Sequence, residues 1–398
     1  MPAAEHETNA QPNSDQAVKE RYSAAAHASE EALCCPVSYN PRYLKAIPAE
    51  IIEKDYGCGD PSPFVGPGET VLDLGSGGGK LCYIAAQIVG KNGLVIGVDC
   101  NADMLSLARK YQQPIAENLG FNNTDFRCGR IQDLKLNLEL LAEQWGNRPL
   151  TSAADWLELR CLEEELRQSH PLIEDNSVDC VVSNCVLNLV NPNDRQQLFR
   201  ELYRVLKVGG RAAISDIVAD EDVPETLQHD GKLWSGCISG AWREDRFLEE
   251  FRNVGFQGIH IAKFESKPWQ TVNGIEFRSM TVVATKTESG ACLDRNQAVI
   301  YRGPFESIMD DDGHQYVRGQ RTAVCHRTFT TLMSEPYQGQ FIAVQPQAAV
   351  ALKTAPEFDC SIDQLRPPQA TKGGLVKLQI SAGDSGQEGD CCGGDSCC

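Results

Sequence analysis

The sequence predicts an α/β protein in which helices cover a mostly parallel sheet of seven strands, followed by a small β-rich C-terminal domain. Three observations lead to this prediction. From Thr70 onward, short β-branched runs alternate with amphipathic helical runs. The first strand-like run leads directly into the glycine-rich turn GSGGGK. After about Ser289 the helical runs stop, and short strand-like segments separated by Gly and Asp replace them.

The strands of the sheet are expected in seven apolar segments. They are TVLDLG (70–75), LVIGVDC (94–100), TDFRCG (124–129), SVDCVVSNC (177–185), GRAAISDIV (210–218), GIHIAKFE (258–265) and FRSMTVVATK (277–286). Helices are expected to begin near Lys80, Ala102, Asp194 and Arg246. We expect the third of these helices to continue to Gly209-Gly210, where glycine can supply the left-handed conformation that ends a helix. A further helix is expected over 19–33.

The same pattern divides the chain into five segments. They are an N-terminal arm with helices at 1–68, a core at 69–218 with a helical insertion at 133–173, a segment at 219–288 that completes the sheet, a β-rich domain at 289–380, and a tail at 381–398. The β-rich domain is expected to include RTAVCHRTF (321–329) as a strand. The tail is rich in Gly, Ser and Asp and is expected to be flexible.

Charge and hydropathy argue against two classes of partner. Acidic residues exceed basic ones by 18, which disfavours nucleic acid and anionic membrane surfaces. The polar, acidic start of the chain does not read as a secretory signal, and we see no segment that could span a bilayer. We therefore expect a cytoplasmic protein whose 17 cysteines are mostly reduced.

The turn after the first strand has the spacing of a cofactor site. Asp73, Gly75 and Gly77 form a D-x-G-x-G turn, and the third glycine of a dinucleotide fingerprint is replaced by Lys80. This departure favours S-adenosylmethionine, which has no pyrophosphate. Asp99 ends the second strand 26 residues after Asp73, where a carboxylate can bind ribose hydroxyls. After the third strand, Ile131 can flank an adenine and Gln132 can meet its amine.

Three cysteines have contexts that indicate accessible thiols. Cys185 ends the fourth strand, at the sheet edge where ligands bind in such folds. Cys58 lies in DYGCGDP and Cys237 in LWSGCISGAW, both rich in glycine. A thiophilic ion selects thiolate ligands, and trivalent arsenic favours three sulfurs in a pyramid with its lone pair pointing away.

These motifs carry a family resemblance. Residues 50–286 resemble a Rossmann-like class I methyltransferase, and the segments YGCG, VSNCVLNLV and LWSGCISGA resemble the three cysteine motifs of the arsenite methyltransferase family. The resemblance implies that Cys58, Cys185 and Cys237 bind As(III) as thiolates. The residues it implies around the S-adenosylmethionine are Tyr56, Gly57, Asp73, Gly75, Gly77, Gly78, Asp99, Met104, Ile131, Gln132 and Asn184.

The resemblance also implies a redox step. In the family, an N-terminal cysteine forms a disulfide with the equivalent of Cys58 during turnover, and Cys34 or Cys35 would fill this role here. Arsenite or its thiol conjugates would be the substrate, and a thiol such as thioredoxin or glutathione would be the reductant. Two alternatives stay open: a methyltransferase for a small organic acceptor, and a metalloid-binding protein without catalysis.

The other cysteines are interpreted by their contexts. The set within predicted strands and helices is expected to fill the core: Cys82, Cys100, Cys128, Cys161 and Cys180. In the C-terminal domain, Cys292, Cys325 and Cys360 lack the spacing of a zinc module, so a metal there is not expected. The tail carries four thiols that could bind arsenic, namely Cys391, Cys392, Cys397 and Cys398.

Removal of the tail 381–398 is expected to lower methyl-transfer activity mainly where arsenite is scarce. Four thiols on a flexible segment can wrap a soft ion at little conformational cost and hand it over. The measurement is steady-state kinetics of the full and truncated chains at low and at saturating arsenite. Unchanged kinetics at low arsenite would remove the capture role from the tail.

Overall fold

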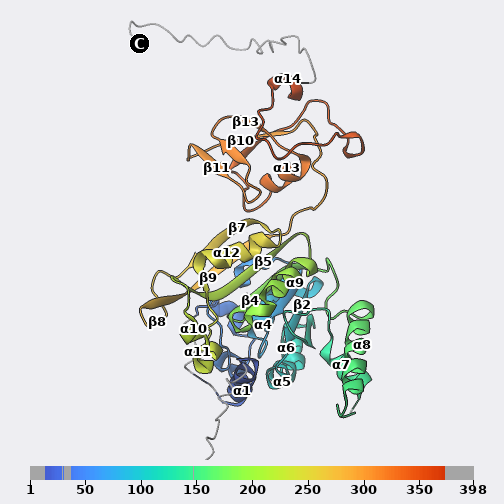
Figure 1. The fold of residues 1–398 in the computed structure, drawn as a ribbon, viewed down its shortest axis with the longest axis vertical. Coiled ribbons are helices and arrows are strands. Elements are labelled where there is room, and N and C mark those ends of the chain that lie inside the picture. Colours follow the sequence, from blue (N-terminus) through green and yellow to red (C-terminus); the bar gives the residue numbers. More distant parts are fainter. Residues whose placement is uncertain (1–13, 29, 31–36, 147, 373–398) are drawn as a thin grey trace, which may run out of the picture. The chain divides into compact units, whose positions relative to one another are not determined.

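The computed structural model describes residues 14–28, 30, 37–146 and 148–372. It separates into two compact units (Figure 1). The N-terminal unit comprises Met1–Ser289 with Asp310–Asp312, and the C-terminal unit comprises Gly290–Met309 with Gly313–Cys398. None of the described helices combines the length and the apolar character needed to cross a membrane.

The N-terminal unit is built on one nine-stranded sheet in the order β3-β2-β1-β4-β5-β9-β7, with β6 beside β5 and β8 beside β9. The strands are β1 Thr70–Leu74, β2 Leu94–Asp99, β3 Thr124–Cys128, β4 Val178–Asn184, β5 Leu206–Ala219, β6 Trp242–Arg243, β7 Gln257–Phe264, β8 Gln270–Val272 and β9 Ile275–Thr285. Strand β9 runs antiparallel to β5 and β7, whereas β1 to β5 pair in parallel. The predicted α/β fold is confirmed, and β6 and β8 are short additions to the seven predicted strands.

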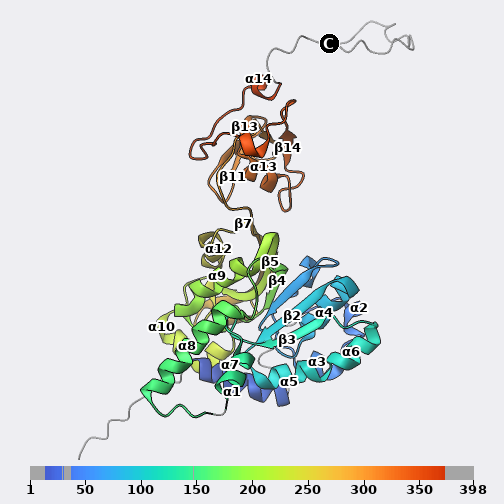
Figure 2. The ribbon, with the colours of Figure 1, turned by 90° about the vertical axis from the view of Figure 1, so that its right-hand side faces the viewer.

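The helices of this unit cover both faces of the sheet (Figure 2). They are α1 Ser14–His27, α2 Pro41–Leu44, α3 Ala49–Glu53, α4 Lys80–Val89, α5 Ala102–Lys110, α6 Gln112–Leu119, α7 Leu138–Trp145, α8 Ala153–Ser169, α9 Arg195–Val205, α10 Glu225–Gln228, α11 Gly231–Ser235 and α12 Glu244–Asn253. Helices α7 and α8 form the predicted insertion between β3 and β4. Helix α1 begins and ends earlier than the predicted 19–33.

Two apolar layers hold the sheet between these helices. One layer joins Leu72 and Leu74 of β1 to side chains of α9 and α12, such as Phe199 and Phe251. The other joins Val71 of the same strand to side chains of α4 and α5. Because β1 is buried on both faces, it reads as a continuous apolar run interrupted only by Asp73. That carboxylate therefore lies at the carboxyl end of a central strand.

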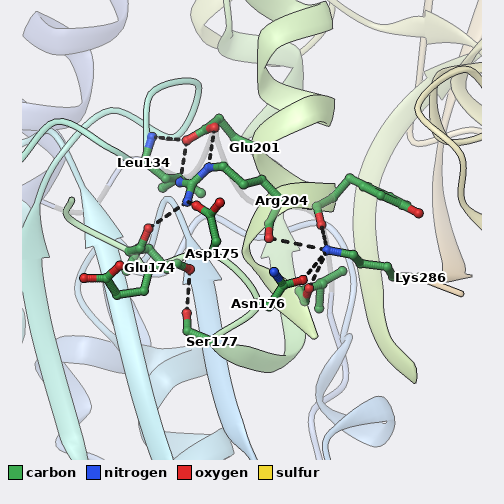
Figure 3. Close-up of polar contacts among 11 residues, drawn as sticks. Leu134, Glu174, Asp175, Asn176, Ser177, Glu201, Arg204 and Lys286 are labelled. Carbon is green, nitrogen blue, oxygen red and sulfur yellow. Dashed lines mark hydrogen bonds and ion pairs between the residues drawn. The ribbon is translucent and has the colours of Figure 1, made fainter. Parts of the chain in front are cut away.

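The end of α9 differs from the prediction. The helix ends at Val205, and Leu206 already pairs with Val178 of the sheet, so Gly209-Gly210 lies inside β5. The Nζ atom of Lys286, and not a glycine, satisfies the backbone carbonyls at the end of this helix. It donates to the carbonyls of Tyr203 and Leu206, each at 2.7 Å, and to Asn176 Oδ1 at 2.8 Å (Figure 3). A cation on the last carbonyls satisfies the acceptors that a helix end leaves open.

A second polar contact ties the helical insertion to α9 (Figure 3). Glu201 accepts the backbone N–H of Leu134 at 2.9 Å and pairs with Arg204. Arg204 also donates to the carbonyl of Ile173 at 3.0 Å. Both ends of the insertion at 133–173 are therefore anchored to the same helix, next to the sheet edge that carries Ile131.

The C-terminal unit is a small mixed fold. Its described elements are β10 Ala298–Tyr301, β11 Ser307–Met309, β12 Gln315–Val317, β13 Arg321–Ala323, α13 His326–Leu332, β14 Phe341–Val344 and α14 Pro368–Thr371. Strands β13, β10 and β14 form one antiparallel sheet, and β11 pairs with β12. The strand predicted over 321–329 is wrong in its second half, because the sulfur of Cys325 accepts the N–H of Thr328 and starts α13.

Replacing Lys286 by Met is expected to destabilise the N-terminal unit by about 2 kcal/mol, because buried carbonyls lose a charged donor. The measurement is urea unfolding followed by tryptophan fluorescence, since all five tryptophans precede Gly290. Lys263→Met, at an exposed position of β7, is the matched control and should change stability by less than about 0.5 kcal/mol. Equal stability of the two variants would contradict this account of how α9 ends.

Candidate functional site

A cavity of about 400 Å³ opens at the carboxyl edge of β1, β2 and β4. All eleven residues predicted to surround a cofactor line it: Tyr56, Gly57, Asp73, Gly75, Gly77, Gly78, Asp99, Met104, Ile131, Gln132 and Asn184. Cys185 lines it as well. The fold thus brings together segments that are more than a hundred residues apart in the sequence, as expected for a ligand site at this edge of an open sheet.

The glycine turn shapes the floor of the cavity. Gly75 and Gly77 have positive φ angles of 70° and 50°. A Cβ atom on Gly75 would come within 2.4 Å of the Val186 side chain, so this position excludes any larger residue. A Cβ on Gly77 would meet no atom within 4 Å and would instead occupy free space. Gly75 therefore serves packing, and Gly77 leaves room for a ligand against the backbone.

Two of the aspartates that line this space, Asp73 and Asp99, lie at the carboxyl ends of β1 and β2. Asp99 accepts the N–H of Gly77 and the N–H of Asn101, each at 2.8 Å. The cap of α5 is the side chain of Asn101, so Asp99 is not engaged as that helix cap. Burial raises the pKa of the Asp99 carboxyl, although backbone N–H groups oppose the shift. Burial also raises the pKa of Asp73 to about 7, against a hydrogen bond from the Cys82 thiol.

These features fit S-adenosylmethionine. Burial raises the pKa of Asp73 and of Asp99, and a positively charged ligand would oppose that rise by favouring the ionised carboxylates. The tight glycine turn provides the close backbone approach.

Asn184 fixes the loop that carries Cys58 to the end of β4. Its Oδ1 accepts the N–H of Cys58 at 2.8 Å and that of Gly59 at 3.0 Å. Its Nδ2 donates to the carbonyl of Gly59 at 2.8 Å and to the hydroxyl of Tyr39 at 2.7 Å. A Cβ on Gly57 would come within 2.1 Å of Asn184 Nδ2, so the loop lies directly on the amide.

Two of the predicted ligand cysteines have an unusual backbone. The described non-glycine residues with positive φ are Asn176, Cys185, Cys237, Asn273 and Asn296. Asparagine tolerates this region well, whereas cysteine does so at a cost of roughly 1 kcal/mol or more. The values are 63° for Cys185 and 61° for Cys237. Strain at these two positions is a signature of a functional constraint on where their thiols point.

The three thiols belong to one buried cluster. Cys58, Cys185 and Cys237 are 4%, 5% and 3% exposed and pack with apolar residues of β5 and β9. The sulfurs of Cys58 and Cys185 lie within 4.8 Å of each other, whereas the thiol of Cys237 donates to the backbone carbonyl of Cys185 at 3.3 Å. The hydrogen bond with Cys237 lowers the pKa of Cys185, but the bond with Cys58 and burial outweigh it and raise the pKa well above its usual value. The pKa of Cys237 is also raised, by its hydrogen bond with Cys185 and by burial.

Two further residues complete the site and were missed in the sequence. A carboxylate oxygen of Asp216 lies within 4.8 Å of the sulfurs of both Cys58 and Cys185. It accepts the N–H groups of Leu187 and Ile217, and burial raises its pKa to about 7. An acidic residue inside the apolar strand ISDIV was a usable signal. Tyr22 of α1 is the second, and its phenol partly offsets the rise in the pKa of the Cys237 thiol.

Helix α1 covers both parts of the site. Tyr22 lines the cavity and packs edge-on against Tyr56, with ring centroids 6.2 Å apart. The guanidinium of Arg21 donates to Ser235 Oγ at 3.0 Å, just before Cys237. Nothing in the composition of 14–27 marked this helix as part of the site, because its polar and small residues indicate only an exposed helix.

The remaining predicted thiols fall into three groups. Cys34, Cys35 and the four tail cysteines lie outside the described residues. Cys82 and Cys180 are buried, as expected of core residues. Cys128 is half-buried and packs against the core. Cys100 and Cys161 are exposed, so the prediction that they fill the core is wrong. Cys100 follows the last residue of β2, and Cys161 lies on the outer face of α8.

Residues 66–141 and 157–255 match a family model described as a methyltransferase domain. With the sheet order and the cavity, this match defines a class I methyltransferase that uses S-adenosylmethionine. An arsenite methyltransferase of Aquipseudomonas alcaligenes is 33% identical over 324 residues, which cover 77% of this chain and 83% of that protein. The chain therefore belongs to the arsenite methyltransferase family.

Two further comparisons extend over the same region. The human arsenite methyltransferase is 29% identical over 313 residues, covering 75% of this chain and 73% of that protein. The crystal structure of an arsenic(III) S-adenosylmethionine methyltransferase from Chlamydomonas reinhardtii is similar with a TM-score of 0.53 and 26% identity, covering 82% of this chain and all of that one. Residues 288–376 match a domain of unknown function.

Replacing Asn184 by Ala is expected to expose the thiol of Cys58. The substitution removes the acceptor of two backbone N–H groups, and a loss of about 1.4 kcal/mol corresponds to a tenfold change in loop opening. Alkylation of Cys58, followed by peptide mass spectrometry, should become about tenfold faster. Asn191→Ala, which removes a cap outside the cavity, is the control. Equal alkylation rates in both variants would show that the amide does not hold the loop.

Proposed function

We propose that this enzyme transfers methyl groups from S-adenosylmethionine to trivalent arsenic bound by the thiols of Cys58, Cys185 and Cys237, as a route of arsenic detoxification. The position of Cys185 is the main support. Cys185 lines the cofactor cavity, its sulfur lies within 4.8 Å of that of Cys58, and its carbonyl accepts the Cys237 thiol at 3.3 Å. An ion on these sulfurs would therefore lie beside the cavity in which the methyl donor binds.

The raised thiol pKa values suit arsenite as the incoming species. Arsenite is a neutral trihydroxide at neutral pH, and each thiol that binds replaces one hydroxide. The thiol proton leaves with that hydroxide as water, so three As–S bonds form with release of three waters and no net proton. Cys185 and Cys237, whose pKa values are raised, can therefore load the ion without a separate general base.

Methyl transfer then depends mainly on alignment. Bound S-adenosylmethionine supplies a methyl group on a positively charged sulfur. Arsenic held by three sulfurs keeps a lone pair, which attacks that methyl as the carbon–sulfur bond breaks, and arsenic is oxidised from the trivalent to the pentavalent state. The carboxylate of Asp216, beside the sulfurs of Cys58 and Cys185, would stabilise positive charge as it develops on arsenic. Burial of the thiols excludes water.

Return of arsenic to the trivalent state requires two electrons. We propose that Cys58 and either Cys34 or Cys35 supply them by forming a disulfide. A thiol reductant such as thioredoxin or glutathione would then reduce that disulfide for the next cycle, in the reducing cytoplasm. Methylation therefore consumes one methyl donor and one dithiol equivalent for each methyl group transferred.

The geometry favours this function over its two alternatives. A methyltransferase for an organic acceptor gains nothing from strained, buried cysteines at the cavity edge, yet Cys185 and Cys237 both carry positive φ angles. A binding protein without catalysis would have no use for the cavity beside the glycine turn. The thiol cluster and the cavity lie side by side, which suits transfer from one to the other.

Cys185→Ser and Cys237→Ser are expected to lower methyl transfer to arsenite at least 100-fold, because a serine hydroxyl is a poor ligand for a thiophilic ion. Cys58→Ser should lose activity to a similar extent. The measurement is transfer from labelled S-adenosylmethionine with arsenite and excess thiol. Cys161→Ser, at an exposed thiol of α8, is the control and should keep full activity.

Cofactor binding separates the outcomes of this test. Each cysteine variant should bind S-adenosylmethionine as the native chain does, apart from small effects in Cys185→Ser. Native protein that binds the cofactor but gives no methylated arsenic would favour an organic acceptor. Activity retained by both Cys185→Ser and Cys237→Ser would remove arsenic from these thiols.

A further inference from the structure

The C-terminal unit contains a second cluster of three thiols. The sulfurs of Cys292, Cys325 and Cys360 all lie within 4.8 Å of one another. The three cysteines are separated by 33 and 35 residues, and we did not expect a metal site from this spacing. The family model that matches 288–376 is described only as a domain of unknown function. No role for these thiols follows from the methyl-transfer site.

Backbone contacts hold the three segments together. Leu293, next to Cys292, forms an isolated bridge with Glu357, and Phe358 donates its N–H to the carbonyl of Cys292 at 2.7 Å. The N–H of His326, next to Cys325, donates to the carbonyl of Leu293 at 2.9 Å. The convergence of the thiols is therefore a property of the fold, produced by backbone pairing on either side of Cys292.

The surroundings of Cys325 favour a sulfur that acts as a ligand. Its Sγ accepts the N–H of Thr328 at 3.4 Å and lies 3.2 Å from the hydroxyl of the same residue. Both contacts stabilise negative charge on sulfur. Cys325 is buried, whereas Cys292 and Cys360 are half-buried, so the cluster has one side open to incoming solutes.

The number of ligands indicates the kind of ion. Within the described residues, the group contains three cysteines and no fourth histidine or carboxylate. The nearby His326 directs Nδ1 toward Gln297 at 3.2 Å. Structural zinc sites close with four protein ligands, whereas trivalent arsenic is complete with three sulfurs and a lone pair. The set of donors therefore matches arsenic better than zinc.

We propose that Cys292, Cys325 and Cys360 form a second binding site for inorganic arsenite, separate from the methyl-transfer site. Loading proceeds with exchange of three hydroxides for three sulfurs and release of three waters. Each methyl group on arsenic removes one exchangeable bond, so the site prefers arsenite over methylated arsenicals. The convergence of the thiols rests on geometry alone, and the choice of arsenic rests on the proposed function.

The first experiment counts arsenic on the full chain. Native protein and Cys292→Ser/Cys360→Ser are reduced, incubated with arsenite, desalted and analysed by native mass spectrometry. The double variant should retain one arsenic fewer per chain than the native protein. Cys100→Ser/Cys161→Ser, at two exposed thiols outside either cluster, is the matched control and should retain the native number. Equal arsenic counts in all three proteins would overturn the proposal.

The second experiment isolates the site. Serine replaces the nine thiols of the other candidate sites, namely Cys34, Cys35, Cys58, Cys185, Cys237, Cys391, Cys392, Cys397 and Cys398. This chain should bind one arsenite with three sulfur neighbours by X-ray absorption, and bind dimethylated trivalent arsenic at least tenfold more weakly. Arsenic bound through fewer sulfurs, or bound zinc that arsenite does not displace, would overturn the proposal.

Methyl transfer provides an independent readout. Cys292→Ser/Cys360→Ser should keep the native kcat at saturating arsenite, which also shows that the variant is folded. If native protein methylates no arsenic but still loses one bound arsenic in this variant, the proposed function fails and the second site stands. A double variant with native arsenic binding and native activity would leave the first site intact and reject the second.

Discussion

The site depends on one side chain, the carboxamide of Asn184. Four hydrogen bonds join this amide to the Cys58 loop and to Tyr39, and Gly57 lies so close that no side chain fits between them. The same residue ends β4 and precedes Cys185. The Asn184 amide therefore sets the position of Cys58 relative to Cys185, although the two cysteines are more than a hundred residues apart in the sequence. The rest of the thiol cluster is arranged around that pair.

Holding these thiols in place lowers the stability of the fold. Cys185 and Cys237 occupy the left-handed region, where residues other than glycine and asparagine are strained. Asp216 is buried beside the sulfurs at a pKa of about 7, far above that of a solvated carboxyl. The two apolar layers around the sheet, with side chains such as Phe199 and Phe251, offset this cost. The strained residues thus lie at the rim of a well-packed core.

The sequence was sufficient for the sheet, the glycine turn and the selection of three cysteines that lie in one buried cluster, because each has a local pattern. Strand alternation, a D-x-G-x-G turn and glycine-flanked thiols are all read within a few neighbouring residues. The end of α9 could not be predicted this way, because it depends on Lys286, which follows β9 and lies 80 residues after Leu206. Asp216 was overlooked for a related reason, as its neighbours at the thiols come from other segments.

The cysteines of the C-terminal unit are a clearer example of a feature that local sequence patterns do not predict. Metal motifs are recognised from short spacings, yet Cys292, Cys325 and Cys360 meet through the backbone bridge between Leu293 and Glu357 and the hydrogen bond from the His326 N–H to the Leu293 carbonyl. Such a bridge leaves no periodic signal in either segment. Cys325 was also predicted to lie in a strand. It caps α13 instead, because its sulfur accepts a backbone N–H. Cysteine rarely caps the start of a helix, so residue preferences for helix caps do not predict this role.

Helix α1 has a consequence for how the two substrates bind. Tyr22 lines the cofactor cavity and influences the pKa of the Cys237 thiol, while Ser23 accepts a hydrogen bond from Asn101 at the start of α5. A single helix therefore contacts the binding regions of both ligands. A change in the position of this helix would therefore affect both regions. By thermodynamic linkage, any factor by which the methyl donor changes arsenite binding equals the factor by which arsenite changes binding of the donor.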